Sequence, residues 1–358
     1  MTMKKFGALF LTLVLLVAML TGCAGKTVVY YTECDCPEGT HVEAPAPAEP
    51  VTPEAPDGTV KIGLAIVANA ASSENAVKAD YDVTIAAVTV DNNGVIHDCI
   101  IDSIGTAVEF DSTGTITSDL TAQPLTKNEL GDDYGMVAYG GAVAEWYEQA
   151  QALADFAVGK TAEELRNGAI DESGKAPAGS DLATSATIYL GGYVSAIESA
   201  VANAKYLGSQ EGDLLRLAIA SSIDGSSNAS ADAEGLAQLY TNVVALTEKD
   251  GVITGCYFDA IQAKVNFDTT GTITTDLSAP MQTKNELGDA YNMKPYGGAI
   301  AEWYEQAASF ASYITGKTAD EVAGIAVDES TKPTEADLVT SVTIKIGEFQ
   351  NLIAKAFN

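Results

Sequence analysis

Hydroxyl side chains gather at two places in this chain of 358 residues, and they stand in the same order at both. One stretch runs from Asp181 to Thr187 with the letters DLATSAT, and the other runs from Asp337 to Thr343 with the letters DLVTSVT. An apolar segment with helical spacing follows each stretch, so each stretch is predicted to lead into a helix. The free backbone N–H groups and the dipole of a helix start suit a phosphate group.

A purely structural interpretation fits the same residues. Asp, Ser and Thr are preferred at helix starts, because their side chains accept hydrogen bonds from the free backbone N–H groups. A duplication of the chain would copy such a cap as readily as a phosphate site, so the second copy is not independent support. On the residues alone, both interpretations stay open.

Little else in the chain is typical of catalysis. The two histidines are His41, in a Pro-rich stretch, and His97, whose counterpart in the second half is Thr254. No nucleophile-elbow motif, no phosphate-binding P-loop and no zinc-binding helix motif occurs. Whether the chain is an enzyme stays open, and a carrier or binding role is favoured over catalysis.

The cysteines also divide into groups. Cys34 and Cys36 are too close in sequence for an easy mutual disulfide, and two ligands alone predict no metal site. Cys99 and Cys256 occupy corresponding places in the two halves. Buried free thiols are favoured there over a disulfide between the halves.

An internal repeat defines the domain organisation. Trp146 and Trp303 lie 157 positions apart, and 24 of 36 residues are identical between 126–161 and 283–318. A unit of about 150 residues can bury a core of its own. Two tandem domains are therefore predicted, repeat 1 over 59–208 and repeat 2 over 209–358.

Each repeat is predicted to have the α+β fold class, with an antiparallel sheet and helices. Strands are expected at 61–67, 81–90 and 95–101, and again at 243–247 and 252–258. Apolar spacing predicts a helix that ends at Gly159 and carries Trp146. That Trp and Trp303 are assigned to the core in preference to stacking on a cofactor. Capping boxes predict further helices after Thr161 and Thr318.

The first residues predict an export signal. Lys4 and Lys5 precede an apolar run, 6–20, that is too short for a stable membrane span. The sequence Leu-Thr-Gly-Cys at 20–23 resembles a bacterial lipobox, which implies a signal peptide over 1–22 and lipidation of Cys23. An ordinary secreted protein is the alternative. The Pro/Ala/Glu-rich stretch within 23–58 predicts a stalk that holds the folded part away from the membrane.

The charge limits the partners. A formal net charge of −30 repels nucleic acid and anionic headgroups, so nucleic-acid binding is not expected. Hydrophobic residues make up 47% of the chain, which is typical of a folded protein.

The motif Asp-x-x-Thr-Ser-Ala-Thr resembles the attachment motif of the FMN-binding domain family, Asp-x-x-Ser/Thr-Gly-Ala-Thr/Ser. The lipobox, the stalk and the tandem arrangement are similar to surface electron-transfer lipoproteins of Gram-positive bacteria within that family. The resemblance implies two tandem FMN-binding-like domains with covalent FMN, joined by phosphoester to the last threonine of each motif. The implied cofactor-binding residues are Thr187, Asp181, Thr184, Ser185 and Ala186 in repeat 1, and Thr343, Asp337, Thr340 and Ser341 in repeat 2.

The same resemblance implies the partners. A flavin transferase would attach FMN, a membrane quinone-linked donor would supply electrons, and extracellular acceptors would receive them. The location implied is the extracytoplasmic face of the bacterial cell membrane, with the chain held by its lipid anchor. The rival hypothesis is a non-redox surface binding or structural lipoprotein built from degenerate FMN-binding-like repeats.

The motif also departs from the family pattern. Ser185 and Ser341 stand where the family has glycine, and Val342 stands where it has alanine. Glycine allows backbone torsions that serine adopts less readily, and valine adds bulk beside the acceptor hydroxyl. Thr187 is therefore ranked above Thr343 as the attachment site.

Overall fold

The computed structural model describes residues 58–358. The predicted signal peptide, Cys23, nearly all of the predicted stalk, Cys34, Cys36 and His41 lie outside these residues and stay predictions. Within 58–358, no helix combines the length and the apolarity needed to cross a membrane.

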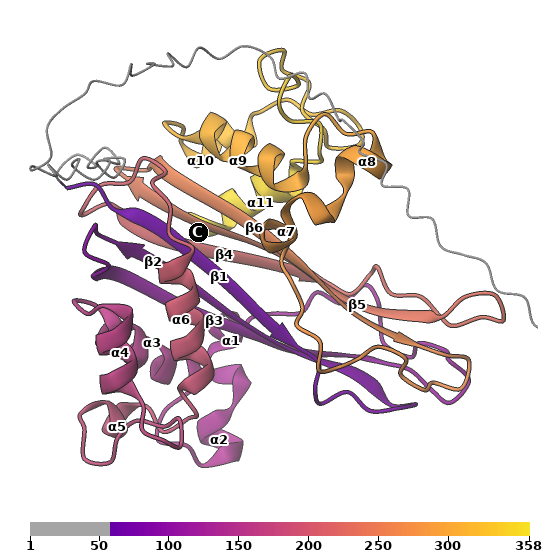
Figure 1. The fold of residues 1–358 in the computed structure, drawn as a ribbon, viewed down its shortest axis with the longest axis horizontal. Coiled ribbons are helices and arrows are strands. Elements are labelled where there is room, and N and C mark those ends of the chain that lie inside the picture. Colours follow the sequence, from indigo (N-terminus) through magenta and orange to yellow (C-terminus); the bar gives the residue numbers. More distant parts are fainter. Residues whose placement is uncertain (1–57) are drawn as a thin grey trace, which may run out of the picture. The chain divides into compact units, whose positions relative to one another are not determined.

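Repeat 1 is built on an antiparallel sheet of three strands in the order β1-β2-β3 (Figure 1). Its strands are β1 (Lys61–Asn69), β2 (Lys78–Val90) and β3 (Ile96–Glu109). The expected hairpin is confirmed, and both strands are longer than the apolar patterns indicated. The first half of β2 alternates between buried and more exposed positions, and its second half, from Ile85 to Val90, is buried on both faces and mostly apolar.

Repeat 2 carries the matching sheet, in the order β4-β5-β6. Its strands are β4 (Leu214–Ser222), β5 (Gly235–Lys249) and β6 (Val252–Phe267). The hairpin turn between β5 and β6 places Asp250 and Gly251 at φ of 53° and 82°, the left-handed region that glycine adopts without strain. The predicted α+β class is confirmed, with one such sheet in each repeat.

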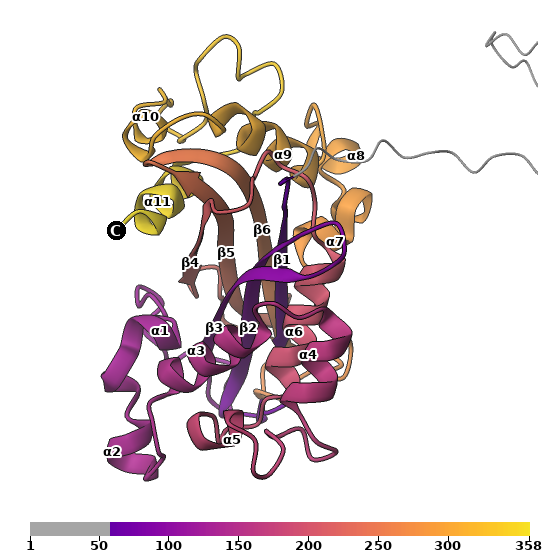
Figure 2. The same cartoon turned by 90° about the vertical axis from the view of Figure 1, so that its left-hand side faces the viewer.

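Helices cover the outer face of each sheet (Figure 2). The helices of repeat 1 are α1 (Lys127–Leu130), α2 (Met136–Gly140), α3 (Trp146–Ala157), α4 (Ala162–Ala169), α5 (Leu182–Ser185) and α6 (Gly191–Ala202), with the 3-10 helix η1 (Gly131–Tyr134). Those of repeat 2 are α7 (Lys284–Leu287), α8 (Met293–Gly297), α9 (Trp303–Ile314), α10 (Ala319–Ala323) and α11 (Gly347–Ala356), with η2 (Gly288–Tyr291). Both predicted capping boxes, at Thr161 and Thr318, are confirmed.

The two sheets pack on each other through a shared hydrophobic core. The rings of Phe110 and Phe267 stack with their centroids 4.0 Å apart, and the Tyr81 hydroxyl donates to the Ala237 carbonyl at 2.8 Å. Each repeat has a second core between its sheet and its own helices. Residues 58–358 consequently lie within one compact unit, and the expected core within each repeat is only part of the packing.

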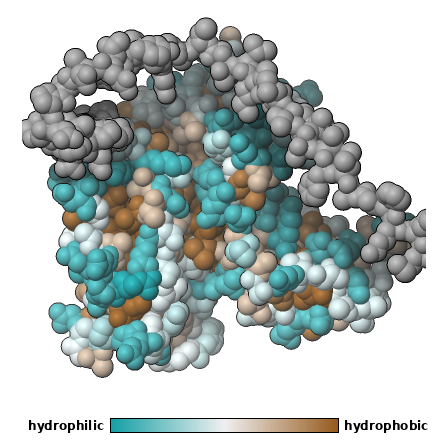
Figure 3. Space-filling model, viewed as in Figure 1, coloured by the Kyte–Doolittle hydropathy of each residue, from teal (hydrophilic) through white to brown (hydrophobic). Residues whose placement is uncertain are grey.

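Contacts between the repeats are reciprocal. The Ala76 N–H donates to the Gly271 carbonyl at 2.8 Å, and the Ala229 N–H donates to the Gly114 carbonyl at the same distance. Paired contacts of this kind are typical of an isologous interface, here formed within one chain. On the face seen in Figure 3, the hydrophobic residues of the described part lie in small separate patches among hydrophilic ones.

Candidate functional site

The first hydroxyl stretch forms a single helical turn, α5, and the long helix α6 begins only at Gly191. The Asp181 side chain makes no capping hydrogen bond. The Thr184 hydroxyl donates to the Asp181 carbonyl at 2.7 Å, and the Ser185 hydroxyl donates to the Leu182 carbonyl at 3.3 Å. The interpretation of these side chains as helix caps is therefore wrong, because they donate to carbonyls and accept no backbone N–H bonds.

The second stretch repeats this pattern. The Thr340 hydroxyl donates to the Asp337 carbonyl at 3.1 Å, and the Ser341 hydroxyl donates to the Leu338 carbonyl at 3.3 Å. No helix is assigned within 337–343, and the single turn α5 of repeat 1 is too short for the helix-dipole argument made from the sequence. Any phosphate partner must therefore come from other groups near the final threonine.

A buried glutamine holds each of these final threonines. Gln306 Oε1 accepts from the Thr343 N–H at 2.7 Å, from the Thr343 hydroxyl at 3.1 Å and from the Ile344 N–H at 3.2 Å. The Gln306 amide donates to the Ala301 carbonyl at 2.7 Å, which fixes the orientation of its oxygen. The glutamine is fully buried and connects α9 to the motif.

Gln149 does the same in repeat 1. Its Oε1 accepts from the Thr187 N–H at 2.7 Å and from the Thr187 hydroxyl at 3.2 Å. Sequence analysis missed both glutamines. The available signal was a polar residue three positions after each Trp, on the helix face predicted to be apolar, in both repeats.

The two departures from the family motif do not obstruct the threonine. Ser185 and Ser341 both have negative φ, so neither position requires the torsions of glycine. The Val342 side chain is fully buried in the core of repeat 2, as Ala186 is almost fully buried in repeat 1. The reason given for ranking Thr187 above Thr343 is therefore wrong, because the valine points into the core.

A cavity of about 550 Å³ adjoins the motif of repeat 2. This volume lies within the range of small-molecule and cofactor pockets, about 300–1,000 Å³. Thr343 lines it together with three lysines, four aromatic side chains and the glycine loop that follows α8. The lining residues used below are Thr343, Lys284, Lys332, Lys345, Tyr240, Tyr291, Trp303 and Glu348.

Lys284 lies in an aromatic cage in this cavity. Its Nζ lies 4.6, 5.1 and 4.9 Å from the ring centroids of Tyr240, Tyr291 and Trp303, and it donates to the Tyr240 hydroxyl at 2.8 Å. Burial lowers the pKa of Lys284 to about 8, partly offset by the nearby carboxylates of Glu348 and Asp259. At neutral pH the side chain is therefore a buried cation.

The other charges of the cavity stand near the start of α11. Lys345 and Lys332 are exposed, and Lys345 precedes the N-cap residue Ile346, which offers no side-chain acceptor to the helix. Glu348 is held by the Asn242 amide at 2.9 Å. Three lysines around one cavity in a chain of net charge −30 make a local site for an anion.

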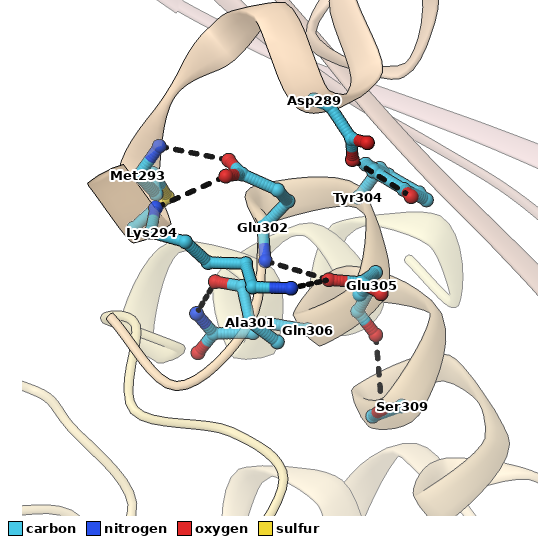
Figure 4. A network of polar contacts seen from close by, with 9 residues as sticks. All are labelled: Asp289, Met293, Lys294, Ala301, Glu302, Tyr304, Glu305, Gln306 and Ser309. Carbon is cyan, nitrogen blue, oxygen red and sulfur yellow. Dashed lines mark hydrogen bonds and ion pairs between the residues drawn. The ribbon is translucent and has the colours of Figure 1, made fainter. Parts of the chain in front are cut away.

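A carboxylate network builds the wall beside the glycine loop (Figure 4). Glu302 is 2% exposed, and its two oxygens accept from the N–H groups of Met293 at 2.8 Å and Lys294 at 3.0 Å, at the start of α8. The Glu302 N–H in turn donates to Glu305 at 2.8 Å. The segment that lines the cavity is thus tied to the first turn of α9, next to Gln306.

The equivalent positions of repeat 1 have different chemistry. By strand register, Asp82 of β2 corresponds to Tyr240 of β5, because their β3 and β6 partners are 157 residues apart. Tyr189 and Gly192 stand where repeat 2 has Lys345 and Glu348. Repeat 1 therefore keeps the threonine and its glutamine but has fewer basic residues around them.

The remaining predictions within 58–358 have clear outcomes. Trp146 and Trp303 are core residues as predicted, at 2% and 5% exposed, although Trp303 also lines the cavity. Cys99 and Cys256 are buried free thiols as predicted. In this part of the chain, no group of three or more His, Cys, Asp or Glu is placed to hold a metal ion. Asp181 and Asp337 are exposed.

Comparisons with known proteins add no assignment. No protein-family model matches the chain, and no curated protein matches it. Among solved structures it is similar to a solution NMR structure of a structural-genomics protein from Clostridium thermocellum, at 22% identity over 41% of this chain and 89% of that one. The TM-score is 0.21, so this similarity does not support a fold or function assignment.

Proposed function

We propose that this protein is a lipid-anchored, extracytoplasmic electron carrier with FMN-binding-like repeats, in which FMN is joined by phosphoester to Thr343 and to Thr187. The observation that carries the proposal is the cavity beside Thr343, where an oriented hydroxyl, three lysines and an aromatic cage meet. When bound there, FMN would supply reversible electron acceptance, which no amino-acid side chain of the cavity offers.

The side chains of the cavity fit the two ends of FMN. Lys332 and Lys345 provide positive charge for a phosphate near the threonine. Tyr240, Tyr291 and Trp303 provide apolar and aromatic surface for a ring system. Glu348 is negative and repels an anion. The lining of the cavity holds three lysines and this one glutamate, so positive side chains predominate in it.

Gln306 prepares the attachment point. Its oxygen fixes the backbone and the hydroxyl of Thr343, so a transferase meets one defined rotamer. A neutral amide is too weak a base to remove the hydroxyl proton, so the transferase must supply that base. Chemical balance also requires an activated donor such as FAD, from which AMP leaves as the bond from oxygen to phosphorus forms.

In-gel flavin fluorescence of the denatured protein, after co-expression with a flavin transferase, tests the proposal. We expect fluorescence that survives denaturation, falls in Thr343→Ala and disappears in the double variant with Thr187→Ala. A dark band, with the transferase active on a control substrate, would exclude the carrier and favour a binding or structural lipoprotein.

A further inference from the structure

Lys284 is the only lysine of the Thr343 cavity that lies in its buried part. It is 5% exposed, whereas Lys332 and Lys345 are exposed at the rim. The exposed pair is suited to a phosphate attached to Thr343, because ammonium groups at the rim can pair with an anion that stays partly in water. A caged ammonium acts on the part of a ligand that enters the cavity most deeply.

We propose that Lys284 stabilises the reduced form of a flavin held at Thr343. This inference rests on the proposed function. Reduction increases the electron density on the ring system of the ligand, and a fixed positive charge near that ring stabilises the reduced form relative to the oxidised form. Because the surroundings of Lys284 are largely apolar, its charge is screened less than that of a surface lysine.

Lys127, the counterpart of Lys284 in repeat 1, has different neighbours. Lys127 Nζ lies 5.3 and 5.2 Å from the ring centroids of Tyr134 and Trp146. The tyrosine that binds Lys284, Tyr240, is replaced there by Asp82. Burial raises the pKa of the Tyr193 hydroxyl, while nearby Lys127 lowers it and Asp82 raises it further. The two lysines therefore differ in the residue beside them, and carboxylates lie near the cage in both repeats.

Repeat 2 also has negatively charged side chains near Lys284. Glu348 and Asp259 face Lys284, and Lys264 adds a further positive charge. Glu348 is engaged by the amide of Asn242, and Asp259 accepts the N–H groups of Ala260 and Asn285, so both carboxylates are partly satisfied elsewhere. These bonds come from neutral donors and leave the carboxylate charges in place, so Lys284 and Lys264 together balance Glu348 and Asp259, and loss of Lys284 would leave negative charge in excess beside the ring.

Potentiometric titration of single-flavin proteins tests the proposal. In the Thr187→Ala background, which leaves one flavin at Thr343, Lys284→Met is expected to shift the equilibrium at least about tenfold toward the oxidised form. That is about 30 mV for a two-electron couple. Lys284→Arg retains the charge and should restore the potential, and Lys127→Met in the same background is the matched control that should change nothing.

Unchanged potential in Lys284→Met, with the flavin attached and Trp303 fluorescence like that of the parent, would overturn the inference while leaving the carrier intact. Lys284→Gln serves as a second variant if the methionine variant does not fold, and an unchanged potential there has the same meaning. Absence of covalent flavin in the Thr187→Ala parent would instead refute attachment at Thr343, and this inference would fall with it.

Discussion

Gln306 Oε1 accepts three hydrogen bonds from the segment that begins at Thr343, the shortest at 2.7 Å from the Thr343 N–H. The same arrangement joins Gln149 to Thr187 across 38 residues of sequence. Gln149 lies on α3 and Gln306 lies on α9. In both repeats, the helix that begins with Trp thereby sets the position of the candidate attachment hydroxyl.

Removal of this glutamine should loosen the motif. Gln306→Leu leaves two backbone N–H groups and the Ala301 carbonyl without their partner, and each unsatisfied buried group costs about 1–3 kcal/mol. We expect a loss of at least about 2 kcal/mol in the free energy of unfolding and reduced flavin attachment at Thr343. Chemical denaturation and in-gel fluorescence measure the two effects.

Gln149→Leu is the matched control for that variant. It should reduce labelling at Thr187 and leave labelling at Thr343 as in the parent. Equal labelling of both threonines in Gln306→Leu would show that the amide is not needed to position the acceptor.

The sequence predicted the scaffold better than the site. Strand alternation, the turn at Asp250-Gly251 and the capping boxes depend on neighbours in sequence, so their patterns gave the α+β class and most elements. The Gln306–Thr343 contact joins residues 37 apart, and the Lys284–Tyr240 contact joins residues 44 apart. Such partners are brought together by the packing of helices on the sheet, which no local pattern contains.

The hydroxyl motif shows most clearly what could not be predicted from the sequence. Thr184 and Ser185 belong to residue types that cap helices, so a cap was one of the two interpretations that the pattern allowed. Their hydroxyls donate to carbonyls one turn earlier because both residues lie within the turn α5 and not ahead of it. The direction of Val342 likewise depends on the core it enters, which sequence spacing did not reveal.

Replacement of Lys345, at the rim of the cavity, should weaken binding of the FMN phosphate. Lys345→Tyr gives repeat 2 the residue that repeat 1 carries at Tyr189. In the Thr343→Ala protein without transferase, we expect the affinity for free FMN to fall about tenfold, the equivalent of about 1.4 kcal/mol. Isothermal titration calorimetry at two salt concentrations measures this affinity, and the parent should show the steeper salt dependence.

Lys249→Tyr, on the hairpin turn between β5 and β6, is the control for the Lys345 variant. The same affinity for Lys345→Tyr and its parent would remove Lys345 from the site.

Asp259 should make stability depend on pH. Burial raises its pKa from 3.8 to about 6 in the folded state, so the folded protein binds more protons than the unfolded chain between these values. The contribution of Asp259 to stability should therefore fall as pH rises from about 4 to 6. Relative to Asp259→Asn, the parent should lose about 2–3 kcal/mol over this window, since one pKa unit corresponds to about 1.4 kcal/mol. Urea denaturation at pH 4, 5, 6 and 7 measures the difference, and parallel pH curves for the two proteins would contradict it.

Folding of the two repeats should be coupled through the stacked rings of Phe110 and Phe267, which belong to the core shared by both sheets. Phe267→Ala removes a fully buried ring, and the expected loss is about 3–5 kcal/mol. Because the ring packs against both sheets, the unfolding transitions followed by far-UV circular dichroism and by Trp fluorescence should shift together in denaturant.

Tyr296→Ala is the control for Phe267→Ala, since the Tyr296 ring is 87% exposed and its removal should change stability by less than about 0.5 kcal/mol. Two separate transitions, with only one moved by Phe267→Ala, would mean that each repeat is stable without the shared core.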